Sequence, residues 1–206
     1  MNKRRPVRSE NLRLALAQEA ARVMAEHGIR DFLAAKRKAA ERFGVVDSAV
    51  LPKNTEIEAA LAQYQRLFAA ESHAQLLLSQ RYVAVQAMRC FADFAPRLVG
   101  PVLSGTATAH CDVQLHVFAD TAEAVLMNLM DRSIPHEVTE RRVKMSVERV
   151  LAYPAVRFVL DDQAVEATVF PADGIRQAPV SPVDGKPMRR ANLAEVEALI
   201  DASAAL

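Results

Sequence analysis

The stretch that decides the fold is residues 97 to 120, Arg97-Leu-Val-Gly-Pro-Val-Leu-Ser-Gly-Thr-Ala-Thr-Ala-His-Cys-Asp-Val-Gln-Leu-His-Val-Phe-Ala-Asp120. Two apolar runs in it flank a short Gly-Thr turn. The first run covers residues 98 to 103. The second, Val113–Phe118, places an apolar residue at every other position, which is the period of a strand. The pattern predicts a strand, a turn and a second strand that begins beside Asp112.

This stretch resembles the nucleotidyltransferase superfamily, whose fold is shared with DNA polymerase beta. The resemblance covers roughly residues 95 to 172 and rests on Gly105-Thr106 followed, after five residues, by Asp112-Val-Gln114-Leu. The family has a Gly-Ser turn before an Asp-x-Asp motif, whereas here Thr106 stands in place of Ser and Gln114 in place of the second carboxylate. The resemblance implies an α+β fold with a mixed sheet of four or five strands and flanking helices.

The resemblance also implies a reaction. Gly105 and Thr106 would bind the phosphates of an NTP. Asp112, Gln114 and Glu166 would hold Mg²⁺, with Asp112 and Glu166 as the catalytic carboxylates. Such ions activate an acceptor hydroxyl and neutralise the leaving pyrophosphate, because the charge of a triphosphate requires cations or aimed donors. The chain would then transfer a nucleotidyl group to an acceptor that the sequence does not identify.

Other roles for these residues stay open. Gly105 is also typical of a strand end, Asp112 of a turn and Glu166 of a solvent-facing strand position. The amide oxygen of Gln114 brings no charge and binds Mg²⁺ less well than a carboxylate oxygen does. The alternative function is therefore a catalytically inactive module with this fold that binds nucleic acid or a protein partner.

The composition is that of an ordinary folded protein, with 206 residues, 51% of them hydrophobic and 25% charged. We expect a helical region at 1–95 and the nucleotidyltransferase-like domain, with a C-terminal loop and helix, at 96–206. No window approaches the roughly 18 apolar residues of a membrane span, so no membrane partner and a cytoplasmic location are expected. Cys90 and Cys111 lack metal or disulfide spacing, which favours buried free thiols.

Positive charge is concentrated in the first half of the chain. Residues 1–100 hold 16 Lys/Arg and 10 Asp/Glu, whereas residues 101–206 hold 10 and 15. A helix expected from about Asp31 to Phe43 is a candidate surface for nucleic acid or a protein partner, although the pair of Arg37 with Glu41 is more typical of a solvated face. The cations of this helix are Lys36, Arg37, Lys38 and Arg42. A helix-turn-helix regulator is a further alternative for this region.

Helical periodicity predicts three more helices in the first 95 residues. The first has Ser9 as its N-cap and ends at Gly28. Another begins at a capping box, Thr55–Glu58, and continues through Phe68. The last of them extends from about His73 to Phe94, until Pro96 stops it.

Helices and strands alternate after residue 120. Thr121 is predicted to cap a helix through Met130. A strand is expected within residues 134–145, and residues 155–160 and 164–170 are expected to form a hairpin. A terminal helix over about residues 192–202 would have Asn192 as its cap and Glu195 at the third position.

The turn-rich loop of residues 181–190 presents Lys186, Arg189 and Arg190. These three cations would clamp phosphate or an acidic partner. The alternative is an exposed loop that ties down the last helix. Either interpretation predicts that the loop lies on the surface.

Histidines surround Asp112 in the sequence. His110, His116 and His136 would form a His/Asp metal cluster if the strands brought them together, and surface or half-buried strand histidines are the alternative. Ser104 as a nucleophile with one of these histidines as its base is a weaker hypothesis, because the Gly-x-Ser-x-Gly motif is absent.

Overall fold

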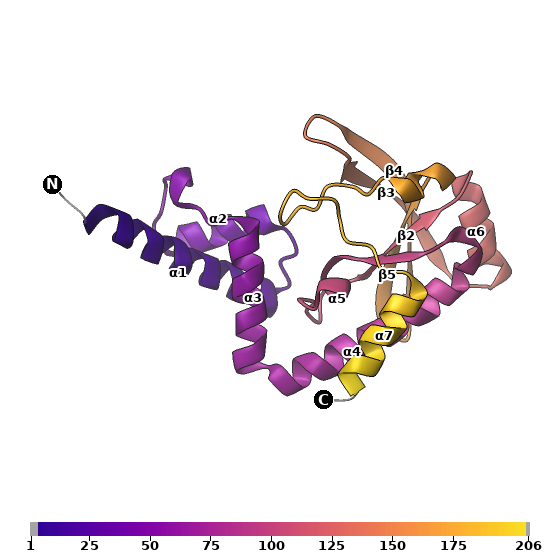
Figure 1. The fold of residues 1–206 in the computed structure, drawn as a ribbon, viewed down its shortest axis with the longest axis horizontal. Helices are drawn as coiled ribbons and strands as arrows, with labels where there is room; N and C mark the ends of the chain where they lie inside the picture. The colour runs from indigo at the N-terminus through magenta and orange to yellow at the C-terminus, as the bar shows by residue number, and fades with distance from the viewer. Residues whose placement is uncertain (1–3, 205–206) are drawn as a thin grey trace. The chain divides into compact units, whose positions relative to one another are not determined.

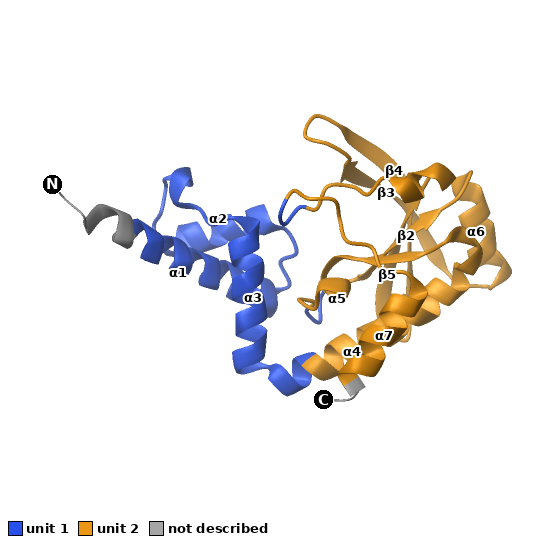
Figure 2. Ribbon diagram, in the orientation of Figure 1, with its two compact units in different colours: residues 1–73, 108–110, 182–184 blue, residues 74–107, 111–181, 185–206 orange. Residues whose placement is uncertain are grey.

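The structure is a computed structural model that describes residues 4 to 204. The chain forms two compact units (Figures 1 and 2). Unit 1 contains the residues up to His73 together with 108–110 and 182–184, and unit 2 contains the remainder. The division after His73 differs from the expected boundary after residue 95. The reason is that Val83, Ala87 and Phe91 are buried in the core beneath the sheet.

Unit 1 is built from three α-helices and a short 3₁₀ turn. Its elements are α1 (Arg4–His27), α2 (Phe32–Arg42), η1 (Ser48–Val50) and α3 (Asn54–Phe68). The buried residues that join the helices include Leu16, Ala20, Ala39 and Ile57. Alanine at the contacts lets helices approach closely, so α1 packs against both α2 and α3. The chain forms η1 between α2 and α3, and the helix-turn-helix alternative for this region stays a prediction.

The helix ends in unit 1 correct two expected starts. The helix expected from about Asp31 is α2, and the Asp31 carboxylate caps it by accepting from the Ala34 N–H at 2.7 Å. The start at Ser9 is wrong, because α1 begins at Arg4. The capping box at Thr55 is also wrong: Glu56 accepts from the Lys53 N–H at 2.6 Å, so α3 begins at Asn54. The sequence has glutamates at positions 56 and 58, and either could have completed a capping box.

Unit 2 is an α+β unit with a five-stranded mixed sheet, which confirms the expected fold class. Its elements are α4 (Ala70–Cys90, in unit 2 from Ala74), η2 (Ala92–Phe94), β1 (Arg97–Val99), α5 (Gly100–Ser104), β2 (Val113–Phe118), α6 (Ala122–Asp131), β3 (His136–Lys144), β4 (Val150–Leu160), β5 (Gln163–Phe170), η3 (Ala172–Arg176) and α7 (Leu193–Ala204). The strand order is β1-β2-β5-β4-β3. Only β2 and β5 pair in parallel, and the other neighbours are antiparallel.

Local signals place most elements of unit 2. Thr121 caps α6 by accepting from the Ala124 N–H, and Asn192 and Glu195 exchange the two hydrogen bonds of a capping box at 2.7 and 3.0 Å. The expected first strand over 98–103 is wrong in its second half. Gly100 takes a positive φ of 72° after β1, and Pro101 then opens the short helix α5, as proline does in a first helical turn.

The two faces of the sheet differ in chemistry. Alternate residues of β2 and β5, such as Val113, Leu115 and Val165, point into an apolar core shared with α4, α6 and α7. The residues between them face the opposite side and are largely polar, because side chains alternate along a strand. We call this second side the polar face. Its end at Phe118 and Phe170 is packed with Met145 and Ile175.

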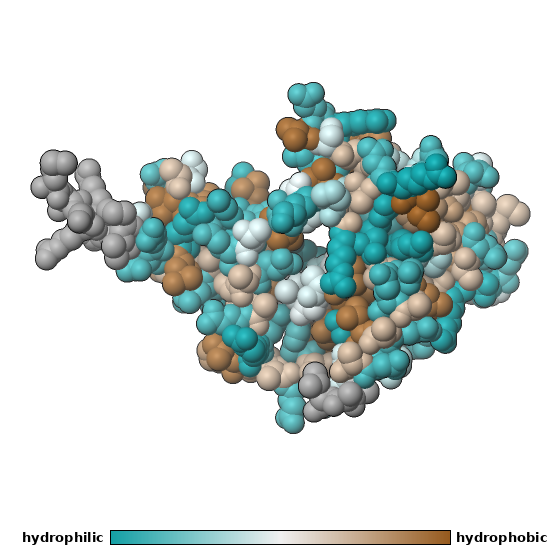
Figure 3. Space-filling view, in the orientation of Figure 1, coloured by the Kyte–Doolittle hydropathy of each residue, from teal (hydrophilic) through white to brown (hydrophobic). Residues whose placement is uncertain are grey.

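The exposed surface shows apolar side chains that are scattered among polar ones in the view of Figure 3. Met127 and Met130 on α6 and Leu67 and Phe68 on α3 are more than half exposed. Scattered exposure of this kind is normal for folded proteins. Within residues 4–204, no helix is both long and apolar enough to cross a membrane. The cysteines, Cys90 and Cys111, are free thiols and are only partly buried.

Candidate functional site on the polar face of the sheet

The polar face brings together the three residues expected to hold metal. Gln114 on β2 lies directly opposite Glu166 on β5 in the parallel register. Asp112 precedes Gln114 by two residues and therefore faces the same side. Asp112 is buried, with 6% of its surface exposed, whereas Gln114 and Glu166 are half-buried. The strand order, which joins β2 to β5, is what places these three side chains side by side.

Two arginines meet the carboxylates of this group. Arg157 on β4 lies opposite Glu166 in the register, and its Nη2 lies 3.4 Å from each carboxylate oxygen of Asp112. Arg141 on β3 reaches Glu166, with Nε 3.5 Å from Oε1. About half of each arginine side chain is exposed, at 45% and 50%. Each carboxylate that was expected to bind metal therefore already has a guanidinium partner.

The expected Mg²⁺ site stays a prediction, and the charges around its residues weigh against it. Mg²⁺ requires oxygen ligands at about 2.0–2.1 Å in near-octahedral geometry, with carboxylates supplying the negative charge. Here one of three positions is the amide of Gln114, and the carboxylates of Asp112 and Glu166 are paired with Arg157 and Arg141. No cluster of three or more His, Cys, Asp or Glu side chains that could hold a metal occurs among the described residues. The site resembles an ion-pair network more than a metal centre.

Gly100 belongs to this site, although the sequence pattern did not single it out. A Cβ added at Gly100 would lie 2.5 Å from Oε1 of Gln114, and the residue has a positive φ of 72°. Only glycine combines that backbone conformation with so close an approach. Gly100 therefore fixes the Gln114 amide against the start of α5. The signal in the sequence was a Gly-Pro pair directly after an apolar run.

The predicted phosphate turn at Gly105 and Thr106 has another role in the structure. Gly105, with a positive φ of 87°, ends α5. The backbone N–H groups of Gly105 and Thr106 both donate to the carbonyl of Pro101, at 2.9 and 3.0 Å. The Thr106 hydroxyl lies 2.9 Å from that of Ser104. Both N–H groups are thus used within the turn, so phosphate binding there stays a prediction that relies on the Thr106 side chain.

The three cations of the 181–190 loop differ in their surroundings, and the expected clamp stays a prediction. Arg190 turns to the polar face, where its guanidinium lies 5.4 Å from the centre of the Phe118 ring. Lys186 and Arg189 are exposed. Arg189 is close enough to the buried Arg81 of α4 to lower the pKa of that guanidinium, after the larger effect of burial. Arg190 alone of these three contributes to the candidate site.

His116 lies in the neighbouring row of the polar face, opposite Arg97 on β1 and Thr168 on β5. It is buried, with 5% of its surface exposed, and its Nδ1 has no hydrogen-bond partner in the described part of the chain. Burial, followed by the nearby charges of Arg190 and Arg141, lowers the pKa of His116 to about 3. The imidazole is therefore neutral at physiological pH.

The other two histidines lie elsewhere. A Cβ added at Gly28 would lie 2.8 Å from Cγ of His110, so His110 packs on the end of α1 within unit 1. His136 has Nδ1 3.0 Å from the carbonyl of Ile134 at the start of β3. Among the described residues, these three histidines and Asp112 form no group of three or more side chains that could hold a metal ion.

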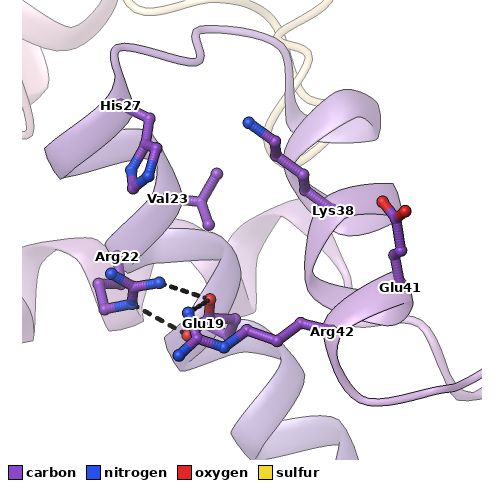
Figure 4. Close-up of a pocket in the computed structure, with 7 residues that line it drawn as sticks. All are labelled: Glu19, Arg22, Val23, His27, Lys38, Glu41 and Arg42. Atoms are coloured by element: carbon purple, nitrogen blue, oxygen red, sulfur yellow. Dashed lines mark hydrogen bonds and ion pairs between the residues drawn. The ribbon is translucent and has the colours of Figure 1, made fainter.

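The basic helix α2 is partly neutralised by α1. Arg42 donates to Glu19 at 3.0 Å, and Arg22 donates to both oxygens of the same carboxylate at 2.8 and 3.0 Å. Together with Lys38, they line a pocket of about 230 Å³ (Figure 4). Lys36 is half-buried, and burial lowers its pKa. Of the four cations of α2, Lys36 is half-buried and Arg42 is paired with Glu19. Nucleic-acid binding by this helix stays a prediction.

Comparisons with known proteins give no relative. No protein-family model, no curated protein and no solved structure matches this chain. The function must therefore be argued from the polar face itself.

Proposed function

We propose that the chain is a nucleotidyltransferase-like module that binds the phosphates of a nucleoside triphosphate on the polar face and does not transfer the nucleotidyl group. The observation that carries this proposal is the pairing of Asp112 with Arg157 and of Glu166 with Arg141. A metal-dependent transferase needs those carboxylates for cations. Guanidinium groups in the same place favour anions, because their fork of donors matches phosphate oxygens.

A second candidate is transfer of a nucleotidyl group from an NTP to an acceptor with a divalent metal. The observation that favours it is the register that sets Gln114 beside Glu166, with Asp112 on the same face. The amide at position 114 and the two arginines weigh against it. Binding of nucleic acid or a protein partner through α2 is a further possibility for a module of this kind, and strong salt dependence of polynucleotide binding would support it.

Isothermal calorimetry separates the first two candidates. The full chain is titrated with each of the four NTPs in the presence of EDTA, Mg²⁺ or Mn²⁺, and the titrations are repeated with Asp112→Ala. The module is expected to bind without metal, and Asp112→Ala is expected to bind at least as well, because Arg157 then loses its counter-charge. A transferase would instead show metal-dependent binding that disappears in Asp112→Ala.

The matched control is Asp120→Ala, which removes an exposed aspartate just beyond β2. It should leave the binding of every NTP unchanged. Heat with none of the four nucleotides, in protein whose circular dichroism shows that it is folded, would refute both candidates.

A further inference from the structure

Two arginines at one end of the polar face have backbone carbonyls as partners. Arg97 Nη1 donates to the carbonyls of Ala95 and Pro96 at 3.1 and 2.9 Å. Arg190 donates to the carbonyls of Gly174 and Ile175 at 3.3 and 2.9 Å. These carbonyl oxygens are neutral, so they hold the guanidinium groups in position without neutralising them.

The backbone brings the two arginines near each other, because their chain neighbours Leu98 and Ala191 form an antiparallel bridge with hydrogen bonds of 2.8 and 2.9 Å. Burial lowers the pKa of Arg190, and the charge of Arg97 lowers it further. Among the described side chains, neither arginine makes an ion pair with a carboxylate, whereas Arg157 and Arg141 on the same face each have one. Two like charges held together in a half-buried place are stabilised by a bound anion.

A third polar group at this place lacks a partner. His116 lies between Arg97 and Thr168 in the sheet register, and its buried Nδ1 has no hydrogen bond to any described residue. Arg190 also acts on His116, since its charge contributes to the lowered pKa of the imidazole. The imidazole is buried and neutral at physiological pH. The net charge at this place is therefore that of the two guanidinium groups.

We infer that Arg97 and Arg190 form a binding site for a phosphate group, next to His116 and independent of divalent metal. Each guanidinium has five N–H donors. Arg97 makes two hydrogen bonds to backbone carbonyls, and Arg190 also makes two. The remaining donors match a tetrahedral oxyanion, and two positive charges select a dianion over chloride. This inference deepens the proposed function and rests on it for one point only, namely that the phosphate belongs to a nucleotide.

The test is a phosphate titration of the full chain followed by NMR, in buffer of constant ionic strength. The ¹⁵N resonances of the His116 imidazole are the local probe, and inorganic phosphate is the ligand. The wild type is expected to saturate, with shifts at His116. Arg97→Gln and Arg190→Gln are each expected to raise the dissociation constant at least tenfold. Arg142→Gln, at an exposed position of β3 that alternates to the other side of the sheet from Arg141, is the matched control and should change it less than twofold.

Several results would overturn the site. They are the absence of saturable shifts in the wild type, equal shifts with chloride, or an equal loss of binding in Arg142→Gln. Because Arg190 also ties η3 to the sheet, Arg190→Gln is read only if its circular dichroism matches the wild type. If Arg190→Gln is not folded like the wild type, Arg97→Gln alone tests the site. That substitution removes only hydrogen bonds to the adjacent residues Ala95 and Pro96.

The same variants separate this site from the proposed function. Phosphate binding that is lost in Arg97→Gln, with no binding of any NTP, would keep the site and refute the nucleotide function. NTP binding of equal affinity in the wild type and Arg97→Gln would keep the nucleotide function and refute the site.

Discussion

The buried histidine of the polar face should make unit 2 sensitive to acid. In the folded state His116 has a pKa of about 3, against an ordinary value of 6.5. Burial lowers this pKa most, and the charges of Arg190 and Arg141 lower it further. Arg97 and Thr168 are its neighbours across the sheet. Between these two pH values the unfolded chain binds a proton at position 116 that the folded chain does not. The contribution of His116 to the free energy of unfolding is therefore constant above pH 6.5 and falls as the pH decreases towards 3.

The size of this effect at pH 5 does not depend on the exact folded value. It is set by the distance of the pH below 6.5, the unfolded pKa of the side chain. At about 1.4 kcal/mol for each pH unit, the protonation of this one residue in the unfolded state costs about 2 kcal/mol at pH 5. That is a large share of the stability of an ordinary domain.

The measurement is urea unfolding by far-ultraviolet circular dichroism at several pH values between 7.5 and 5.0. His116→Phe replaces the imidazole by another ring in an environment that includes Phe170, 4.6 Å away between ring centres. The variant is expected to lose about 2 kcal/mol less than the wild type between pH 7.5 and 5.0. His136→Phe, at the partly exposed start of β3, is the control. Equal acid losses in the wild type and His116→Phe would show that the folded chain accommodates the imidazolium, and the reasoning would fail.

Three further changes test the packing. Gly100→Ala should lower the free energy of unfolding by about 1–3 kcal/mol, because Gly100 has a positive φ and lies against Gln114. The double variant with Gln114→Ala should recover part of that loss. No loss in urea unfolding would contradict the contact. Asn192→Ala should cost about 1 kcal/mol through the lost cap of α7, and unchanged thermal unfolding would argue against it. Ile57→Ala should cost about 2–5 kcal/mol in unit 1, whereas Leu67→Ala on the same helix, 63% exposed, should be nearly neutral.

Local signals in the sequence were sufficient for most helices and their ends. The cap at Thr121 and the box of Asn192 with Glu195 were predicted correctly, because each hydrogen bond joins residues three apart. Errors arose where neighbouring residues offered the same chemistry. Glu56 instead of Glu58 completes the cap of α3, and a Gly-Pro pair turned the second half of an apolar run into α5.

The candidate site depended on contacts that no local pattern contains. The sequence alone determined an α+β chain with a helical first part, and it singled out Asp112, Gln114 and Glu166 through a family resemblance. Only the strand order paired β2 with β5 and set Arg157 against Asp112, residues 45 positions apart in the chain. It also placed Arg97 opposite His116. Helix caps form within one turn of chain, whereas sheet neighbours are chosen by the burial of whole strands, so the charge of this face was decided by the tertiary structure.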